Sequence, residues 1–349
     1  MFGYKIKWFA HSPRPLGLGY HLILIGRISG KLTVKKYPHG TVIRQAQRKY
    51  YYRGENEQFS SSQSTLSRHL NKIKNREERL FEEFVSSLKY FEFTRIINSF
   101  DHINSFAEAG ITVLYENIAQ HYGIRTRWLD ITNDFDIALF FACCKYVDNK
   151  WMPLTNLDID SKEESKYGII FRKPTDHFSN ILSSELIEYE VLPVGYQPFM
   201  RCSMQTAYSI FMTNDKDLQK SDFEILRFNQ SEYLSNFIFE RMEKGKKVYP
   251  HEGLTSILKQ VDLINNSKIF STEVFDVACD NFKDLTRKSW KQTIIDHNYK
   301  IGSSPITLTD NDIRLLNKDY ESFSIEEFYN IDLKTRLTFR PDDREMKDD

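Results

Sequence analysis

The sequence predicts an α+β fold in which a mixed or antiparallel β-sheet forms the core and helices flank it. Runs rich in Tyr, Phe, Val and Ile pack well on a pleated surface and predict strands, most clearly at 50–52, 168–171, 188–194 and 208–212. Apolar residues recur every three or four positions between 66 and 88, which is typical of one or two amphipathic helices. The apolar run at 137–142 predicts a further helix, buried on most sides, that Asn133 caps.

Composition excludes several classes of protein. The 349 residues carry 48 Lys and Arg against 48 Asp and Glu, so no overall field attracts nucleic acid or membranes. Four cysteines show neither a CxxC pair nor a Cys/His metal spacing, so we expect no zinc site and a reducing compartment. No apolar run reaches eighteen residues, so we expect a cytoplasmic protein without membrane contacts.

The sequence divides into four expected regions. Residues 1–40 contain short strand-like pieces and predict an extension of the main domain, which covers 41–262. Residues 263–340 are polar and mostly helix-prone, and residues 341–349 form an acidic tail that we expect to be disordered.

A basic and aromatic segment ends in Tyr52, Arg53 and Gly54. The tyrosines predict a strand, Arg53 at its end presents a planar fork suited to phosphate, and Gly54 allows the backbone to approach a ligand closely. The helical segment after it also carries basic residues, so the two together predict a strip for nucleic acid. The alternatives are an arginine paired with a carboxylate and an ordinary solvated helix face.

Polar side chains are most densely grouped at 120–132. Gln120, His121, Tyr122, Thr126, Arg127 and Asp130 lie there around Gly123, which permits a turn with positive φ. A polar loop fixed by a buried helix is typical of a functional site. Each residue also has a structural interpretation, such as Asp130 pairing with Arg127 or His121 packing in the core.

This stretch resembles the central signature of the FRG domain family, which is named for a Phe-Arg-Gly motif. Here that motif reads Tyr52-Arg53-Gly54, and two further blocks follow in the family's order, at 201–207 and 249–254. More loosely, the strand-borne arginine and a later Glu-x-Glu at 188–190 resemble the ADP-ribosyltransferases. That resemblance implies a related fold and NAD as substrate.

The resemblance assigns roles to residues of this chain. Arg53 is expected to grip the diphosphate, His121 and Gln205 to form hydrogen bonds with the ribose or the acceptor, and Glu190 to be the first candidate for the catalytic carboxylate. The expected NAD-binding residues are Tyr52, Arg53, Gly54, Gln120, Tyr122, Thr126, Arg127, Asp130 and Arg201. We expect Arg53 and His121 to face one cleft, and no metal to be required.

The function implied is an NAD-dependent ADP-ribosyltransferase that acts as a toxin or anti-phage defence effector on a cellular target. RNA rather than DNA is the expected nucleic acid acceptor, and a toxin implies an antitoxin partner. Two alternatives stay open. One is a metal-independent nuclease with His121 as general base, and the other is a module that senses a nucleotide without catalysis.

Overall fold

The core of the protein is one antiparallel sheet of six strands. A computed structural model describes residues 23–25, 33–37, 40–44, 50–108, 112–175, 191–194, 197–304, 306–322 and 336–338. In spatial order the strands are β11 (Glu224–Asn229), β8 (Tyr167–Pro174), β4 (Tyr50–Glu55), β5 (Trp128–Thr132), β10 (Ala207–Phe211) and β9 (Val191–Pro193). All five pairs of neighbouring strands in this sheet are antiparallel, so the α+β class with an antiparallel sheet is confirmed.

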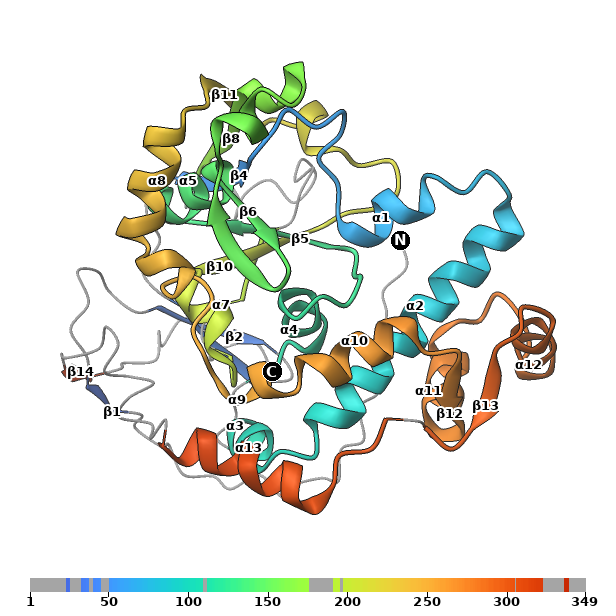
Figure 1. Cartoon of the computed structure of the whole chain (residues 1–349). Coiled ribbons are helices and arrows are strands. Elements are labelled where there is room, and N and C mark those ends of the chain that lie inside the picture. The colour runs from blue at the N-terminus through green and yellow to red at the C-terminus, as the bar shows by residue number, and fades with distance from the viewer. Residues whose placement is uncertain are drawn as a thin grey trace, which may run out of the picture.

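Helix α5 (Phe135–Cys143) lies against one face of this sheet, on the side of β4 and β8 (Figure 1). A Cβ atom on Gly54 would lie 1.8 Å from the carbonyl oxygen of Ala138, so only glycine permits this close approach. Gly54 therefore serves contact between strand and helix, and the expectation that it makes room for a ligand is corrected. The predicted helix is present, but its N-cap is Asp134 instead of Asn133, one residue later than predicted.

The opposite face of the sheet carries an apolar cluster. Tyr51, Leu129, Phe171 and Tyr208, on four different strands, are buried together there. Because side chains alternate along a strand, Arg53 and Glu55 share the face of Tyr51, whereas Tyr52 and Gly54 face α5. By the same rule the side chains of Asp130 and Thr132 lie on the face of α5, which is consistent with the pairing of Tyr52 with Thr132.

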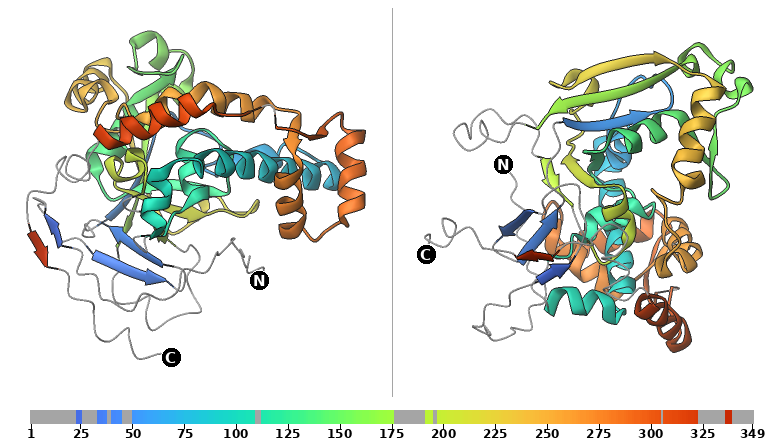
Figure 2. Two further views of the ribbon diagram at one scale, coloured as in Figure 1. Left: turned by 90° about the horizontal axis from the view of Figure 1, so that it is seen from below. Right: turned by 90° about the vertical axis from the view of Figure 1, so that its left-hand side faces the viewer.

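A mostly helical part of the structure adjoins the sheet. In the right-hand view of Figure 2 the sheet lies above these helices. The longest of them is α2 (Arg76–Ile97), which Asn75 caps, so the periodic segment at 66–88 forms two helices, α1 (Thr65–Leu70) and α2. The other helices of this part are α3 (Asp101–Glu108), α4 (Tyr115–His121), α9 (Gly253–Ser256), α10 (Leu258–Asn266), α11 (Thr272–Asn281), α12 (Arg287–Asp296) and α13 (Asp310–Ser322). The parallel strands β12 (Ile269–Ser271) and β13 (Lys300–Gly302) lie among them.

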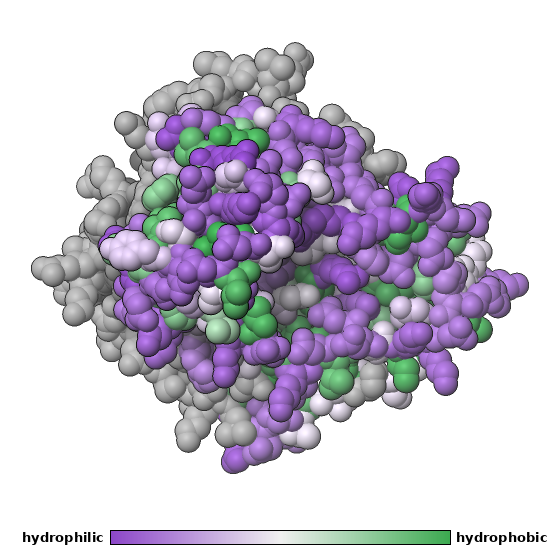
Figure 3. Space-filling model, turned by 45° about the horizontal axis from the view of Figure 1, so that its top comes forward, coloured by the Kyte–Doolittle hydropathy of each residue, from purple (hydrophilic) through white to green (hydrophobic). Residues whose placement is uncertain are grey.

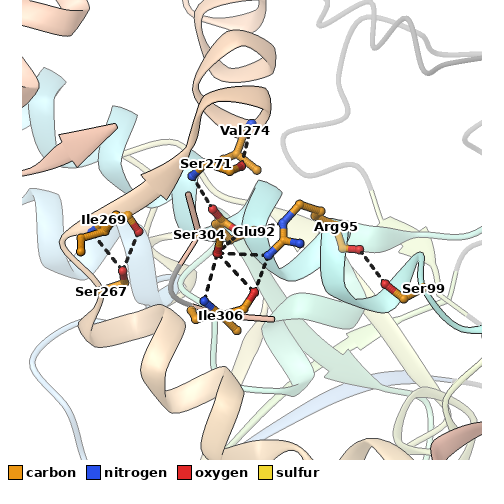
Figure 4. A network of polar contacts seen from close by, with 9 residues as sticks. All are labelled: Glu92, Arg95, Ser99, Ser267, Ile269, Ser271, Val274, Ser304 and Ile306. Carbon is orange, nitrogen blue, oxygen red and sulfur yellow. Dashed lines mark hydrogen bonds and ion pairs between the residues drawn. The ribbon is translucent and has the colours of Figure 1, made fainter. Parts of the chain in front are cut away.

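One buried carboxylate joins these later elements to α2 (Figure 4). Glu92 is 1% exposed, and it accepts hydrogen bonds from the amide of Ser271 at 2.8 Å, the Arg95 Nε at 2.9 Å and the Ser304 hydroxyl at 3.2 Å. Arg95 donates in turn to the carbonyl of Ile306 at 2.6 Å. The largely helical region predicted after residue 262 is thus attached to the main domain through a polar network as well as apolar contacts.

The hairpin β6 (Cys144–Val147) and β7 (Lys150–Pro153) follows α5 directly, and α8 (Glu232–Arg241) packs against α5. The remaining short elements are α6 (Asn156–Ile159), η1 (Glu163–Lys166), α7 (Met200–Met204), η3 (Leu218–Lys220) and η4 (Glu243–Gly245). The face drawn in Figure 3 is mostly hydrophilic, with small separate groups of hydrophobic residues. No helix in the described ranges is long and apolar enough to cross a bilayer.

Two pairs of peripheral strands include residues of the expected N-terminal extension. β2 (Thr33–Tyr37) pairs with β3 (Gly40–Arg44), so the expected border between residues 40 and 41 falls inside a paired strand. β1 (Ile23–Ile25) pairs with β14 (Arg336–Thr338), which brings segments from the two ends of the chain together. Residues 188–190, with the expected carboxylate Glu190, lie outside the described residues, as does the tail at 341–349.

Candidate functional site

Arg201 is the most unusual charged residue of the predicted site. Its guanidinium lies over the rings of two tyrosines, 4.4 Å from the centre of Tyr122 and 4.3 Å from that of Tyr249. The Arg201 NH1 donates to the main-chain oxygen of His121 at 2.9 Å, whereas its Nε is buried without a hydrogen-bond partner. Arg201 is 5% exposed and forms no ion pair with any described residue. A buried cation without a paired carboxylate makes this position a candidate site for an anion.

A fully buried glutamate fixes the positions of Tyr122 and of the helix that carries Arg201. Glu252 accepts a hydrogen bond from the hydroxyl of Tyr122, and its second oxygen accepts from the amide of Met200 at 2.7 Å. Met200 is the first residue of α7, the helix that carries Arg201. One carboxylate therefore holds both the ring beneath the guanidinium and the start of the helix that presents it.

Three more predicted residues lie beside Arg201. The His121 Nε2 is 3.8 Å from the Asp130 Oδ1, and the amide group of Gln205 donates to the main-chain oxygen of Val248 at 2.9 Å. The Asp130 carboxylate also accepts from the Ser209 hydroxyl at 3.2 Å. The His121 side chain is only 2% exposed, against 27% for Asp130, so Asp130 is the more accessible of the two.

Burial controls the protonation of His121. Desolvation lowers the pKa of His121 below its ordinary value of 6.5; Asp130 opposes this effect, and the neighbouring positive charge of Arg201 adds to it. The imidazole is therefore neutral at pH 7, able to donate one hydrogen bond and to accept another. Burial likewise raises the pKa of Tyr249 to about 12, so its phenol keeps its proton.

A cleft of about 1290 Å³ opens beside Arg201. Arg201, Tyr249 and His251 line it together with residues of α7, α8, η4 and the hairpin β6–β7. Its lining contains six Lys or Arg and three Asp or Glu, so the cleft favours anions. The volume exceeds the ~300–1000 Å³ of most small-molecule sites and accommodates a dinucleotide.

Arg53 lies on the other face of the sheet from this group. Its Nε donates to the buried Glu55 at 3.0 Å, and its NH1 donates to the main-chain oxygen of Asp130 at 2.8 Å. Glu55 also accepts from the Ser62 hydroxyl at 2.6 Å. The expectation that Arg53 and His121 face one cleft is corrected, because strand alternation directs Arg53 away from the Asp130 side chain that His121 approaches.

The remaining predicted binding residues make structural contacts. Arg127 forms an ion pair with Glu83 and donates to Asn214 at 3.0 Å, and the Thr126 hydroxyl donates to Gln120. Tyr52 packs edge-on against Phe135, with ring centres 5.5 Å apart. Gly123 has a φ of 91°, so the predicted turn with positive φ is confirmed. These residues hold the 120–132 segment in place between α2, α4 and β5.

Tyr249 and Glu252 were not predicted as site residues. Both belong to the block at 249–254 that resembles the family pattern, and this resemblance is the sequence feature that could have identified them as site residues. Their role depends on packing against Arg201 and Tyr122, which the sequence does not reveal. Within the described residues, no three His, Cys, Asp or Glu side chains cluster as metal ligands would.

Comparison with known families agrees with the motif analysis. Residues 48–150 match the family model of the FRG domain, so the chain contains an FRG domain. No curated protein and no solved structure matches the chain significantly. The matched range covers β4, the 120–132 segment and α5, while Arg201 and Tyr249 lie beyond it.

Proposed function

We propose that this FRG-domain protein is an NAD-dependent ADP-ribosyltransferase whose donor substrate lies in the cleft beside Arg201. The observation that carries the proposal is the buried guanidinium that has no carboxylate partner. Burying a cation without a counter-charge costs roughly several kcal/mol. Binding of a ligand with concentrated negative charge would offset this cost. The diphosphate of NAD supplies such charge, and a planar guanidinium binds two of its oxygens at once.

Aromatic rings near Arg201 suit the two bases of NAD. Tyr249, Tyr146 and Trp151 form a group in which ring centres lie 5.1 to 5.6 Å apart. Such rings stack on flat heterocycles such as nicotinamide and adenine. The combination of one anion site, aromatic rings and a cleft of this volume fits a dinucleotide better than a mononucleotide.

The reaction requires a carboxylate near the ribose. The C–N bond between ribose C1′ and nicotinamide breaks, nicotinamide leaves as a neutral molecule, and the acceptor's nucleophile bonds to C1′ while releasing a proton. Positive charge builds on the ribose in the transition state, and a carboxylate stabilises it. We assign this role to Asp130, because it is accessible and lies 3.8 Å from His121, whose main-chain oxygen accepts a hydrogen bond from Arg201. Neutral His121 is placed to accept the acceptor's proton. Glu190 stays an untested candidate.

We include the effector role because a small transferase that needs no metal suits a toxin or defence effector, and a toxin implies an antitoxin partner. The proposal assigns diphosphate binding to Arg201 in place of Arg53, whose guanidinium is engaged by Glu55 and Asp130. An ADP-ribosyltransferase-like fold is part of the same proposal; the six-stranded antiparallel sheet supports it only in general terms.

The test is incubation of the purified protein with NAD labelled on the adenylate phosphate and with cell extract. Transfer of label to RNA, DNA or protein, with release of nicotinamide, supports the proposal. Shortened nucleic acid without transfer means a nuclease, and intact bound NAD means a sensor; either result overturns the proposal.

Asp130→Asn should lower the transfer rate by about 10²- to 10³-fold. Asp160→Asn, at an exposed position that follows α6, is the matched control and should leave the rate unchanged.

A further inference from the structure

The rim of the cleft combines basic and aromatic side chains from two segments. Lys150 and Trp151 are on β7, and Lys246 and Lys247 follow η4, which contains Lys244. The segments touch where Gly245 packs on Trp151, since a Cβ atom on Gly245 would lie 3.0 Å from that of the tryptophan. Four lysines are therefore gathered around a single contact at the mouth of the cleft.

Much of this positive charge has no fixed partner. Lys150 and Lys246 are exposed and form no ion pair with any described residue. Lys244 and Lys247 lie 3.7 Å and 3.4 Å from glutamates of the preceding turn, in exposed pairs that contribute little. The rim thus presents ammonium groups that an incoming polyanion can contact, with release of counterions.

An aromatic path connects this rim to the buried anion site. Tyr146 is 42% exposed, and its ring centre lies 5.1 Å from that of Trp151 and 5.6 Å from that of Tyr249. Tyr249 in turn contacts Arg201. A base stacked on Tyr146 would therefore lie two rings away from the guanidinium at the floor of the cleft.

The backbone of the rim is strained. Glu243 and Lys244 have φ values of 52° and 57°, and Asp148 and Asn149 in the hairpin turn have values of 48° and 61°. Left-handed non-glycine residues cost roughly 1–3 kcal/mol each and are concentrated at functional sites. Asp148 and Asn149 have the left-handed values that a two-residue hairpin turn requires, so the strain beside the lysine group is that of Glu243 and Lys244.

We propose that this rim binds a single-stranded polynucleotide, which is the acceptor if the proposed ADP-ribosyltransferase activity holds. Lysines beside exposed rings are the combination that binds single strands, because phosphates contact the ammonium groups and unpaired bases stack on the rings. A duplex hides its base faces, and an acidic peptide offers no flat rings to Tyr146. The Arg201 floor of the cleft stays available to the donor.

The test is fluorescence anisotropy of the full chain with labelled strands of about 12 nucleotides, within the length that single-strand sites cover. Oligo(U) and oligo(dT) distinguish RNA from DNA, and a duplex of equal length and a polyglutamate peptide are competitors. Wild type should prefer single strands. Lys150→Glu/Lys246→Glu should weaken binding at least tenfold and reduce the salt slope by about 1.4, for two lost phosphate contacts. Tyr146→Ala should weaken it by about fivefold or more.

The matched control is Lys288→Glu/Lys291→Glu, two exposed lysines of α12, which lies at the opposite side of the molecule in Figure 1. This variant carries the same change of charge and should bind strands as wild type does. Equal loss in both double variants, preference for duplex or polyglutamate, or no binding at low salt would overturn the proposal. NAD affinity, measured separately, should be equal in wild type and the two lysine double variants. If NAD is not consumed while strands still bind, only the acceptor role fails.

Discussion

Arg201 and His121 are joined through the main chain, because the Arg201 guanidinium donates a 2.9 Å hydrogen bond to the His121 carbonyl oxygen. The same histidine directs its ring toward Asp130, so one residue connects the anion site to the accessible carboxylate. The two proposed functions, binding of diphosphate by Arg201 and stabilisation of charge on the ribose by Asp130, would therefore both depend on the position of His121. Variants in this group separate them.

Arg201→Lys tests the anion site. Lysine keeps the charge but loses the planar group held between Tyr122 and Tyr249 and the fork that binds two oxygens. We expect the Kd for NAD to rise about 10- to 100-fold, the range for losing a hydrogen bond to a charged group. Isothermal titration calorimetry measures this. Arg227→Lys is the control, because Arg227 also stacks on a tyrosine, 3.4 Å from the ring centre of Tyr167, but does not line the cleft. Unchanged NAD affinity in Arg201→Lys would contradict the assignment.

Gly54→Ala tests the contact between sheet and helix. The new methyl group would lie 1.8 Å from the Ala138 carbonyl oxygen, so α5 must move away from β4. We expect a loss of about 3 kcal/mol or more in the free energy of unfolding, at the upper end for overpacking. Urea denaturation measures it. Gly302→Ala is the control, because no atom lies within 4 Å of the added Cβ there. Equal stability of the two variants would show that the close approach is not what requires glycine.

Local signals account for the parts of the fold that were predicted. Periodicity at 66–88 and the apolar run at 137–142 gave helices because burial of one face depends on spacing alone. Asn133 and Asp134 are adjacent and chemically similar, so the sequence does not distinguish which one caps α5. The face on which Arg53 lies depends on how β4 pairs with β5 and β8, a long-range property. For the same reason the packing of Tyr249 on Arg201 was not predicted, although both residues lie in blocks that matched the family pattern.

Two histidines whose pKa values shift in opposite directions, His121 and His297, predict opposite pH dependences. Burial lowers the pKa of His121, so the unfolded chain gains its proton first and stability is lost as the pH falls through 6.5. Burial also acts downward on His297, but the Thr293 carbonyl and Glu78 outweigh it and raise the pKa of His297. His297 therefore adds stability at low pH, which is lost as the pH rises through its folded-state pKa.

These signs are checked with His121→Gln and His297→Gln, by urea denaturation at pH values below and above 6.5. Relative to wild type, His121→Gln should lose less stability on acidification, and His297→Gln should lose more. Because the two variants shift in opposite directions, a general effect of removing a histidine cannot produce both results. Parallel changes in the two variants would show that at least one assigned environment is incorrect.

Glu92→Ala tests the attachment of the later elements to α2. The change leaves the amide of Ser271 without its acceptor and removes the partner of Arg95, which is itself partly buried. Removing one member of a buried ion pair costs about 3–5 kcal/mol. We expect a loss of this order, with faster hydrogen exchange at Ser271 and Val274 than in the central strands. Glu77→Ala, an exposed residue in the first turn of the same helix, should cost less than about 1 kcal/mol. Uniform exchange changes across the sheet and α11 would mean that Glu92 supports the whole fold instead of this attachment.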